Sequence, residues 1–102
     1  EVANHLGLSA DNERVEFRDE WVGNGYEHAD TKVLETIRLV ARETGLILDP
    51  TYTGKAFTAM LDMIHEGDIV SGSRVLFWHT GGLLNLLAAR EYIKGILDHE
   101  LF

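Results

Sequence analysis

The segment from Leu46 to Ala56 constrains the fold of this chain more than any other, because a short apolar run leads through a polar loop into a helical pattern. The run Leu46-Ile47-Leu48 does not alternate with polar residues, which is typical of a strand covered on both faces. After the loop, apolar residues recur at helical spacing up to about Glu66-Gly67, namely Ala56, Phe57, Met60, Met63 and Ile64. Since α/β folds bind their ligands at the carboxyl ends of strands, we expect a ligand site at this loop.

A second segment has the same layout. Val75-Leu76-Phe77-Trp78 is predicted to be a strand, residues 79–82 form a polar turn with two glycines, and a helix is expected from Leu83 to about Leu97. That helix is apolar over most of its first two turns, which predicts that it is well buried. The loops that follow the two strands should lie at one edge of the same sheet.

Two further elements complete the predicted architecture. Residues 14–18 alternate between polar and apolar side chains like an edge strand. A helix is expected from Asp30 or Thr31, either of which can cap its N-terminus, to Gly45, a residue typical of the position after a helix. Strands that alternate with helices and are apolar without interruption predict an α/β fold, a three-layer αβα arrangement with a short, mostly parallel sheet.

Composition narrows the functional classes. The 102 residues carry a formal net charge of −8, which disfavours nucleic acid and anionic membrane surfaces as partners. No cysteine is present, so disulfides, thiolate metal sites and a cysteine nucleophile are excluded. The five histidines show no pairing at helical spacing, so no metal site is expected. Because no apolar run is long enough to span a membrane and no signal-peptide pattern opens the chain, the sequence predicts a cytoplasmic protein.

The two loops together carry a family resemblance. Asp49-Pro50-Thr51-Tyr52-Thr53-Gly54-Lys55-Ala56, followed by Leu76-Phe77-Trp78-His79-Thr80-Gly81-Gly82, resembles the C-terminal third of enzymes of the D-cysteine desulfhydrase and aminocyclopropane-carboxylate deaminase family. These are fold type II, tryptophan synthase beta-like enzymes that use pyridoxal 5'-phosphate (PLP). The similarity extends from about Val15 to Ile96 and implies PLP as the cofactor and a small amino acid as the substrate.

Enzymes of the resembled family are much longer than this chain, and their cofactor-holding lysine matches none of its lysines. We therefore interpret residues 1–102 as a single α/β domain, the C-terminal part of the larger PLP-binding domain of a longer enzyme. A polypeptide of these residues alone is predicted to be inactive. It is also predicted to associate, either as a homo-oligomer or with the missing N-terminal part.

The resemblance implies catalytic roles for two tyrosines. Tyr52 matches the tyrosine whose ring lies beside the cofactor ring, whereas on the residues alone a tyrosine packed between loop and helix is the commoner arrangement. Tyr26 matches a second active-site tyrosine of the family. Here the sequence departs from the pattern, because Glu27, His28 and Ala29 stand where the family usually has glycine, an apolar residue and proline.

Cofactor-binding roles are implied for Thr80, Thr53 and Gly81, together with Tyr52. Thr80 aligns with the residue near the pyridine nitrogen, where a hydroxyl can donate a hydrogen bond but cannot stabilise a pyridinium charge, which favours β-elimination over transamination. The deaminase branch usually has Glu and Leu at positions 53 and 80, so the two threonines of this chain agree with the desulfhydrase branch. Gly81 and Gly82 allow a close backbone approach to a ligand, or form only a tight strand-to-helix turn.

Lys55 follows a glycine but does not complete a phosphate-binding P-loop, because Ala56 stands where serine or threonine is needed. We expect Lys55 to cap or tether the loop. The predicted function of the complete enzyme is β-elimination from D-cysteine to pyruvate, sulfide and ammonia. Two alternatives remain open, a deaminase of the aminocyclopropane-carboxylate type and a catalytically silent α/β module that associates with itself.

Overall fold

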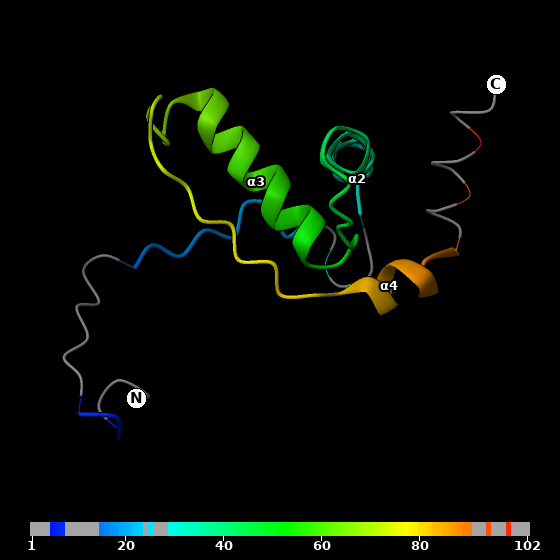
Figure 1. Ribbon diagram of the computed structural model, residues 1–102, viewed down its shortest axis with the longest axis horizontal. Helices are drawn as coiled ribbons and strands as arrows, with labels where there is room; N and C mark the ends of the chain where they lie inside the picture. The colour runs from blue at the N-terminus through cyan, green and yellow to red at the C-terminus, as the bar shows by residue number, and fades with distance from the viewer. Residues whose placement is uncertain are drawn as a thin grey trace.

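The computed structural model describes residues 5–7, 15–23, 25, 29–90, 94 and 98. This part of the chain contains the helices α2 (Thr31–Thr44), α3 (Thr53–Glu66) and α4 (Leu83–Ala88). Helices α2 and α3 pack against each other, and irregular segments from before α2 and after α3 pass beside α3 (Figure 1). Among the described residues, no helix has both the length and the apolar character that a membrane span requires.

Helix α2 begins and ends where the sequence predicts. The Asp30 carboxylate accepts a hydrogen bond from the Val33 N–H at 2.9 Å and so caps the first turn. Gly45 follows the last turn with φ of 74°, and its N–H donates to the Ala41 carbonyl at 3.0 Å. Both ends of the helix are therefore fixed by short-range contacts.

Helix α3 ends at Gly67 as predicted, but it begins three residues earlier than Ala56. Thr53, Gly54 and Lys55, which the sequence places in a loop, form its first turn. The helix can start this early because its first N–H groups are satisfied by a carboxylate that precedes them in the chain, as described below.

One small apolar core joins the described elements. Its buried members are Val33, Ile37 and Val40 of α2 together with Leu48. Phe57 of α3 and Phe77 pack against this core, and their rings meet edge to face with 5.0 Å between centroids. The segment that leads to residue 80 is thereby held against α3.

The predicted sheet is not formed among the described residues. Residues 15–19, 45–49 and 73–82 run without regular secondary structure and without a ladder of backbone hydrogen bonds. A side chain joins two of these segments instead, because His79 Nε2 donates to the Ile47 carbonyl at 2.9 Å. Apolar side chains that a covered sheet would bury stay exposed, Leu76 at 85% and Trp78 at 77%. The predicted strand segments therefore lack the backbone pairing that would make them a sheet.

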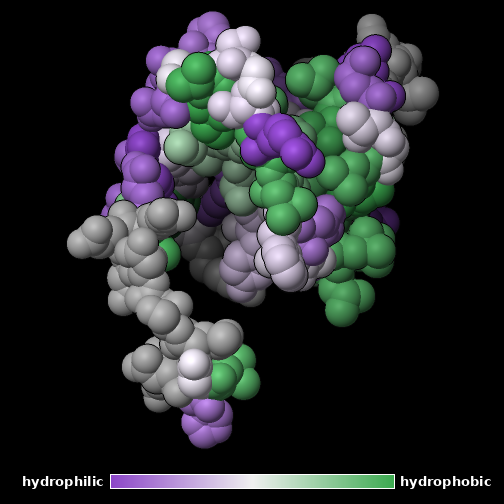
Figure 2. Space-filling view, turned by 60° about the vertical axis from the view of Figure 1, so that its left-hand side comes forward, coloured by the Kyte–Doolittle hydropathy of each residue, from purple (hydrophilic) through white to green (hydrophobic). Residues whose placement is uncertain are grey.

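Helix α4 is shorter and more exposed than predicted. It ends at Ala88 rather than near position 97, and Arg90, Lys94 and Asp98 are again helical, with the residues between them outside the described part. None of its residues is buried, and Leu84 is 80% exposed. The prediction of a well-buried helix is wrong because no described element packs over α4. Figure 2 shows apolar side chains over much of the right-hand part of that view, with smaller groups elsewhere on the same face.

Candidate functional site

The carboxylate of Asp49 organises the start of α3. Oδ1 accepts hydrogen bonds from the Thr53 N–H at 2.8 Å and from the Thr53 hydroxyl at 2.7 Å. Oδ2 accepts from the N–H groups of Thr51 at 2.7 Å and Tyr52 at 2.9 Å. The carboxylate therefore satisfies backbone donors that the beginning of a helix leaves unpaired, and its negative charge suits the positive end of the helix dipole.

Asp49 is 1% exposed, yet it is held in its charged form. Burial raises the pKa of the Asp49 carboxyl, but the hydrogen bonds donated by Thr53, Tyr52 and Thr51 together outweigh burial and bring the pKa below its ordinary value. The sequence analysis missed this residue. The signal that could have found it is an aspartate placed just before the N–H groups of a helix start, a residue type that accepts such bonds.

Two glycines approach Asp49, Gly54 from the first turn of α3 and Gly82 from the turn before α4. A Cβ on Gly54 would lie 2.5 Å from the Asp49 carbonyl oxygen and 2.9 Å from Ile37 of α2. Gly82 has φ of 96°, and a Cβ there would collide with the Asp49 carboxylate. Only glycine lets both backbones come this close. The start of α3, next to Tyr52, and the turn that carries Thr80 are thus packed against the same residue, Asp49.

His79 fixes the turn that carries Thr80. Its Nδ1 accepts a hydrogen bond from the Gly81 N–H at 3.0 Å, so the neutral ring carries its proton on Nε2. Nε2 then donates to the Ile47 carbonyl in the segment before Asp49. Through these two bonds, His79 orients the turn that follows it. The Gly81 N–H is used inside the turn, which agrees with the interpretation of Gly81-Gly82 as a tight turn.

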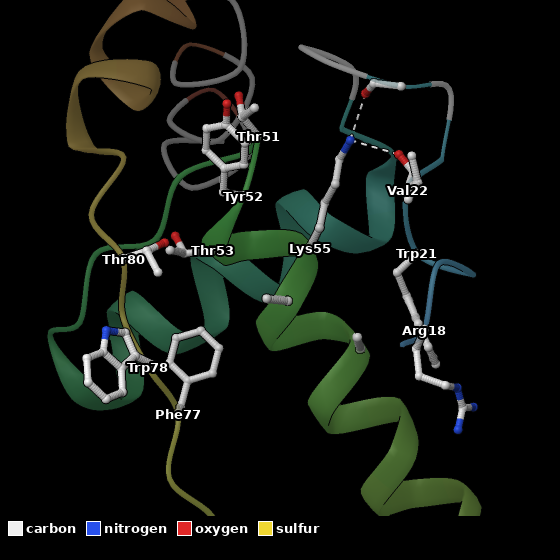
Figure 3. Close-up of a pocket in the computed structure, with 13 residues that line it drawn as sticks. Arg18, Trp21, Val22, Thr51, Tyr52, Thr53, Lys55, Phe77, Trp78 and Thr80 are labelled. Atoms are coloured by element: carbon white, nitrogen blue, oxygen red, sulfur yellow. Dashed lines mark hydrogen bonds between the residues drawn. The ribbon is translucent and has the colours of Figure 1, made fainter. Parts of the chain in front are cut away.

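A pocket of about 450 Å³ lies at the start of α3 (Figure 3). One wall comes from residues 18–25, the floor from the first turns of α3, and the opposite wall from residues 77–80. Tyr52, Thr53 and Thr80 all line it. Gly81 lines an adjoining hollow of about 640 Å³, which also includes Tyr52 and Thr80. The structure therefore brings together four of the five predicted site residues.

These residues differ in what they can offer a ligand. Tyr52 is 51% exposed at the rim shared by both hollows. The Thr80 side chain is exposed, and in the described part of the chain no hydrogen bond engages its hydroxyl. By contrast, the buried Thr53 hydroxyl donates to Asp49 Oδ1 and accepts from the Asp49 N–H at 2.9 Å. In this structure Thr53 holds the loop, while Thr80 has a donor available.

Tyr26 lies outside the described residues, so its predicted catalytic role stays a prediction. Its neighbour Gly25 lines the pocket, as do Trp21 and Val22. Trp21 is bonded to α3, because its indole N–H donates to Asp62 Oδ2 at 2.8 Å. The same oxygen accepts a hydrogen bond from the Lys32 ammonium of α2 at 2.7 Å. The hydrogen bond from Lys32, followed by that from Trp21, lowers the pKa of the Asp62 carboxyl.

Two cationic side chains line the pocket, and no carboxylate among the described residues does so. Arg18 pairs with Glu16 and Glu20 at 2.8 Å each and with Asp68 at 3.3 Å, and these hydrogen bonds, first that to Glu16, raise the pKa of its guanidinium. The Lys55 ammonium donates to the carbonyls of Val22 and Gly25. Lys55 is therefore a tether, as expected. Because three carboxylates compensate the charge of Arg18, Lys55 is the cation of the lining that no carboxylate among the described residues pairs with.

Metal binding finds no support in this part of the chain. Within the described residues, no group of three or more histidine, cysteine, aspartate or glutamate side chains is placed to hold a metal ion.

Comparison with known proteins adds to this geometry. A family model described as pyridoxal-phosphate dependent enzyme matches residues 1–81. A Pyrococcus furiosus protein, whose name suggests 1-aminocyclopropane-1-carboxylate deaminase activity, is 46% identical over 70 residues, which cover 69% of this chain and 20% of the relative. The 1-aminocyclopropane-1-carboxylate deaminase of Burkholderia ambifaria is 36% identical over 89 residues, which cover 87% of this chain and 26% of the relative.

The deaminase of the same name from Burkholderia vietnamiensis is 39% identical over 74 residues, which cover 72% of this chain and 22% of the relative. The chain thus spans about a fifth to a quarter of the length of the relatives that it matches.

Proposed function

This chain belongs to the family of pyridoxal-phosphate dependent enzymes, and from that premise we propose that it is the C-terminal segment of a lyase that acts on a small amino acid, with Tyr52 and Thr80 facing the cofactor. The enzymes of this family depend on PLP, so the cofactor follows from membership. The α/β class follows in the same way. The finer architecture, a three-layer αβα arrangement with a short parallel sheet, belongs to this proposal for the complete enzyme.

The observation that carries the proposal is the Thr80 hydroxyl, which is exposed in the pocket and engages no described partner, beside the half-exposed Tyr52 ring. These groups fit a pyridine ring. An aromatic side chain can lie against its face, and a hydroxyl can donate to its nitrogen. The Lys55 ammonium in the pocket lining could attract the phosphate of the cofactor or the carboxylate of a substrate.

The chemistry that PLP supplies when bound is the withdrawal of electrons from the substrate α-carbon. The contribution of this chain is to set how strong that withdrawal is. A neutral hydroxyl at Thr80 would donate to an unprotonated ring nitrogen and would not stabilise a charged one, as a carboxylate would. We infer that this favours loss of a β-substituent over transamination. Tyr52 would hold the ring and bring a phenol to the substrate.

Two substrates remain candidates, each with its own support. Thr53 and Thr80 match the desulfhydrase branch of the resembled family and favour D-cysteine, which with water would give pyruvate, sulfide and ammonia. The three relatives described above are named for deaminase activity, which favours 1-aminocyclopropane-1-carboxylate. The test is to supply both compounds to the complete enzyme and to measure sulfide and ammonia. Ammonia from the cyclopropane compound without sulfide from D-cysteine would exclude the first candidate.

Substitution at Thr80 tests its place at the ring. Thr80→Val removes one neutral hydrogen bond, worth about 0.5–1.5 kcal/mol net, so PLP should bind somewhat more weakly. Thr80→Asp should favour a protonated ring and increase racemisation or transamination at the expense of elimination. Pyruvate, amino-acid chirality and pyridoxamine phosphate are measured for each variant. If the product ratio is unchanged with the carboxylate in place, Thr80 does not contact the ring.

A further inference from the structure

Lys55 joins two parts of the pocket that are about thirty residues apart in the sequence. Its ammonium donates to the Val22 carbonyl at 2.9 Å and to the Gly25 carbonyl at 2.8 Å (Figure 3). Hydrogen bonds from a charged donor are stronger than those between neutral groups. Two of the three N–H donors of the ammonium are therefore committed to the carbonyls of Val22 and Gly25. We call the described residues of this stretch, Val22, Gly23 and Gly25, the tethered segment.

Among the described residues, the tethered segment is held less firmly at Gly25 than at its start. Gly23 and Gly25 both have positive φ, 65° and 96°, and glycine gives the backbone wide conformational freedom. At its N-terminal side the segment is anchored, because the Val22 N–H donates to the Asp19 carbonyl at 3.2 Å and the indole N–H of the preceding Trp21 donates to Asp62 Oδ2 of α3 at 2.8 Å. In the described part of the chain, the bond from Lys55 is the hydrogen bond that reaches Gly25.

The base from which Lys55 extends is, by contrast, fixed. Gly54 packs against Ile37, and its N–H donates to the Asp49 carbonyl at 2.8 Å. Thr53, the residue before Gly54, donates two hydrogen bonds to the Asp49 carboxylate. Lys55 can therefore fix Gly25 relative to α3, at the end of the segment that lies away from the Trp21 contact.

We propose that Lys55 is a positioning residue, which holds the tethered segment in place as the wall of the pocket across from Thr80. Val22, Gly25 and Lys55 line the same pocket as Tyr52 and Thr80, so a shift of this segment changes the shape of the pocket. The importance of this wall for catalysis rests on the proposed function, in which Tyr26, the residue after Gly25, is an active-site tyrosine. The tether itself does not depend on that function.

The 102-residue chain is small enough for backbone NMR, which can test the tether without a ligand. In Lys55→Met, the heteronuclear NOE of the Val22, Gly23 and Gly25 amides should fall, with loss of rigidity confined to this segment and the amides of α3 unchanged. Lys55→Arg keeps a cationic donor of similar length and should restore most of the NOE. Lys94→Met removes the same charge from an exposed side chain and should change nothing. Unchanged NOE values in Lys55→Met would overturn the proposal, and so would an equal loss throughout α3.

Titration with PLP separates this inference from the proposed function. In the wild-type chain, PLP should shift the amide resonances of both Tyr52 and Gly25. In Lys55→Met, the shift at Gly25 should be lost while that at Tyr52 remains, which supports the wall as positioned by the tether. Equal shifts at Gly25 in both proteins would overturn the positioning role. If PLP shifts no pocket resonance in the wild type, the proposed function loses support, while the NOE measurements still decide on the tether.

Discussion

Replacement of Asp49 by Asn is the sharpest test of how this site is built. The amide has nearly the shape of the carboxylate but keeps only one oxygen that can accept, and it carries no charge. If its nitrogen takes the place of Oδ2, the N–H groups of Thr51 and Tyr52 lose their acceptor. If it takes the place of Oδ1, the buried Thr53 N–H does. Either orientation therefore leaves backbone donors unpaired, in the first turn of α3 or just before it.

The magnitude follows from these contacts. A buried donor without a partner costs about 1–3 kcal/mol, and a hydrogen bond to a charged group contributes about 1.5–3 kcal/mol. The orientation with nitrogen at Oδ2 is the less costly one, because Thr51 and Tyr52 are partly exposed and water can replace some of the lost bonding. We therefore expect Asp49→Asn to lower the free energy of unfolding by about 2 kcal/mol. In a chain of this size that corresponds to a fall in Tm of roughly 8–16 °C.

The stability difference between wild type and Asp49→Asn should also depend on pH in a definite direction. Because the pKa of Asp49 is lower in the folded chain than its ordinary value of 3.8, the carboxylate stabilises the fold above that value, and the contribution is lost as pH falls toward the folded pKa. The difference in stability between wild type and Asp49→Asn should be constant near neutral pH and shrink below about pH 4. Thermal and urea unfolding followed by circular dichroism measure it.

A matched control is Asp98→Asn, which makes the same chemical change at an exposed side chain and should leave Tm within about 1–2 °C of wild type, since exposed substitutions usually have small effects. If Asp49→Asn lowers stability no more than this control, or if the difference persists unchanged in acid, the carboxylate does not hold the start of α3.

Three other changes test neighbouring parts of the structure. Gly54→Ala should lower Tm, measured by circular dichroism, because the new Cβ would lie 2.5 Å from the Asp49 carbonyl oxygen. Alanine in place of glycine inside a helix ordinarily stabilises it, so a rise in Tm would contradict the close approach. Asp62→Ala should increase acrylamide quenching of Trp21, measured in a Trp78→Phe background, because the indole N–H loses its acceptor, and equal quenching before and after would refute the contact. The exposed apolar side chains predict a homodimer or higher oligomer that buries roughly 1,000 Å² or more, and a clean monomer at high concentration in analytical ultracentrifugation would count against it.

The helices could be predicted because their signals are short-range. Asp30 caps α2 three residues ahead of the N–H that it accepts from, and Gly45 and Gly67 end α2 and α3 in the left-handed conformation. The closeness of Tyr52 and Thr80 was also predicted, through the expectation that both loops lie together. In the structure they meet through the Asp49 side chain and the Gly82 backbone, which is a contact that no pattern of apolar residues encodes.

The burial of α4 and the pairing of strands could not be predicted, because both depend on segments that are distant in the sequence. Leu84 is apolar and lies on a helix, yet its burial requires an element packed over it, and no described element is. Leu76 and Trp78 have strand character, but a strand exists only through the backbone groups of its neighbours. The early start of α3 was missed for a related reason, because its cap is Asp49, four residues before Thr53, and not a residue adjacent to the helix.

The first turn of α3 therefore bears on both walls of the pocket. Asp49 fixes this turn through Thr53 and packs against Gly82, which sets the wall that carries Thr80. Two residues further on, Lys55 extends from the same turn to Gly25 and sets the opposite wall. Both walls are attached to the same turn, the first turn of α3. The distance between the walls therefore depends on a few hydrogen bonds made by residues of this turn, and less on the extended segments that form the walls. Such an arrangement lets weakly held segments form a pocket of definite width.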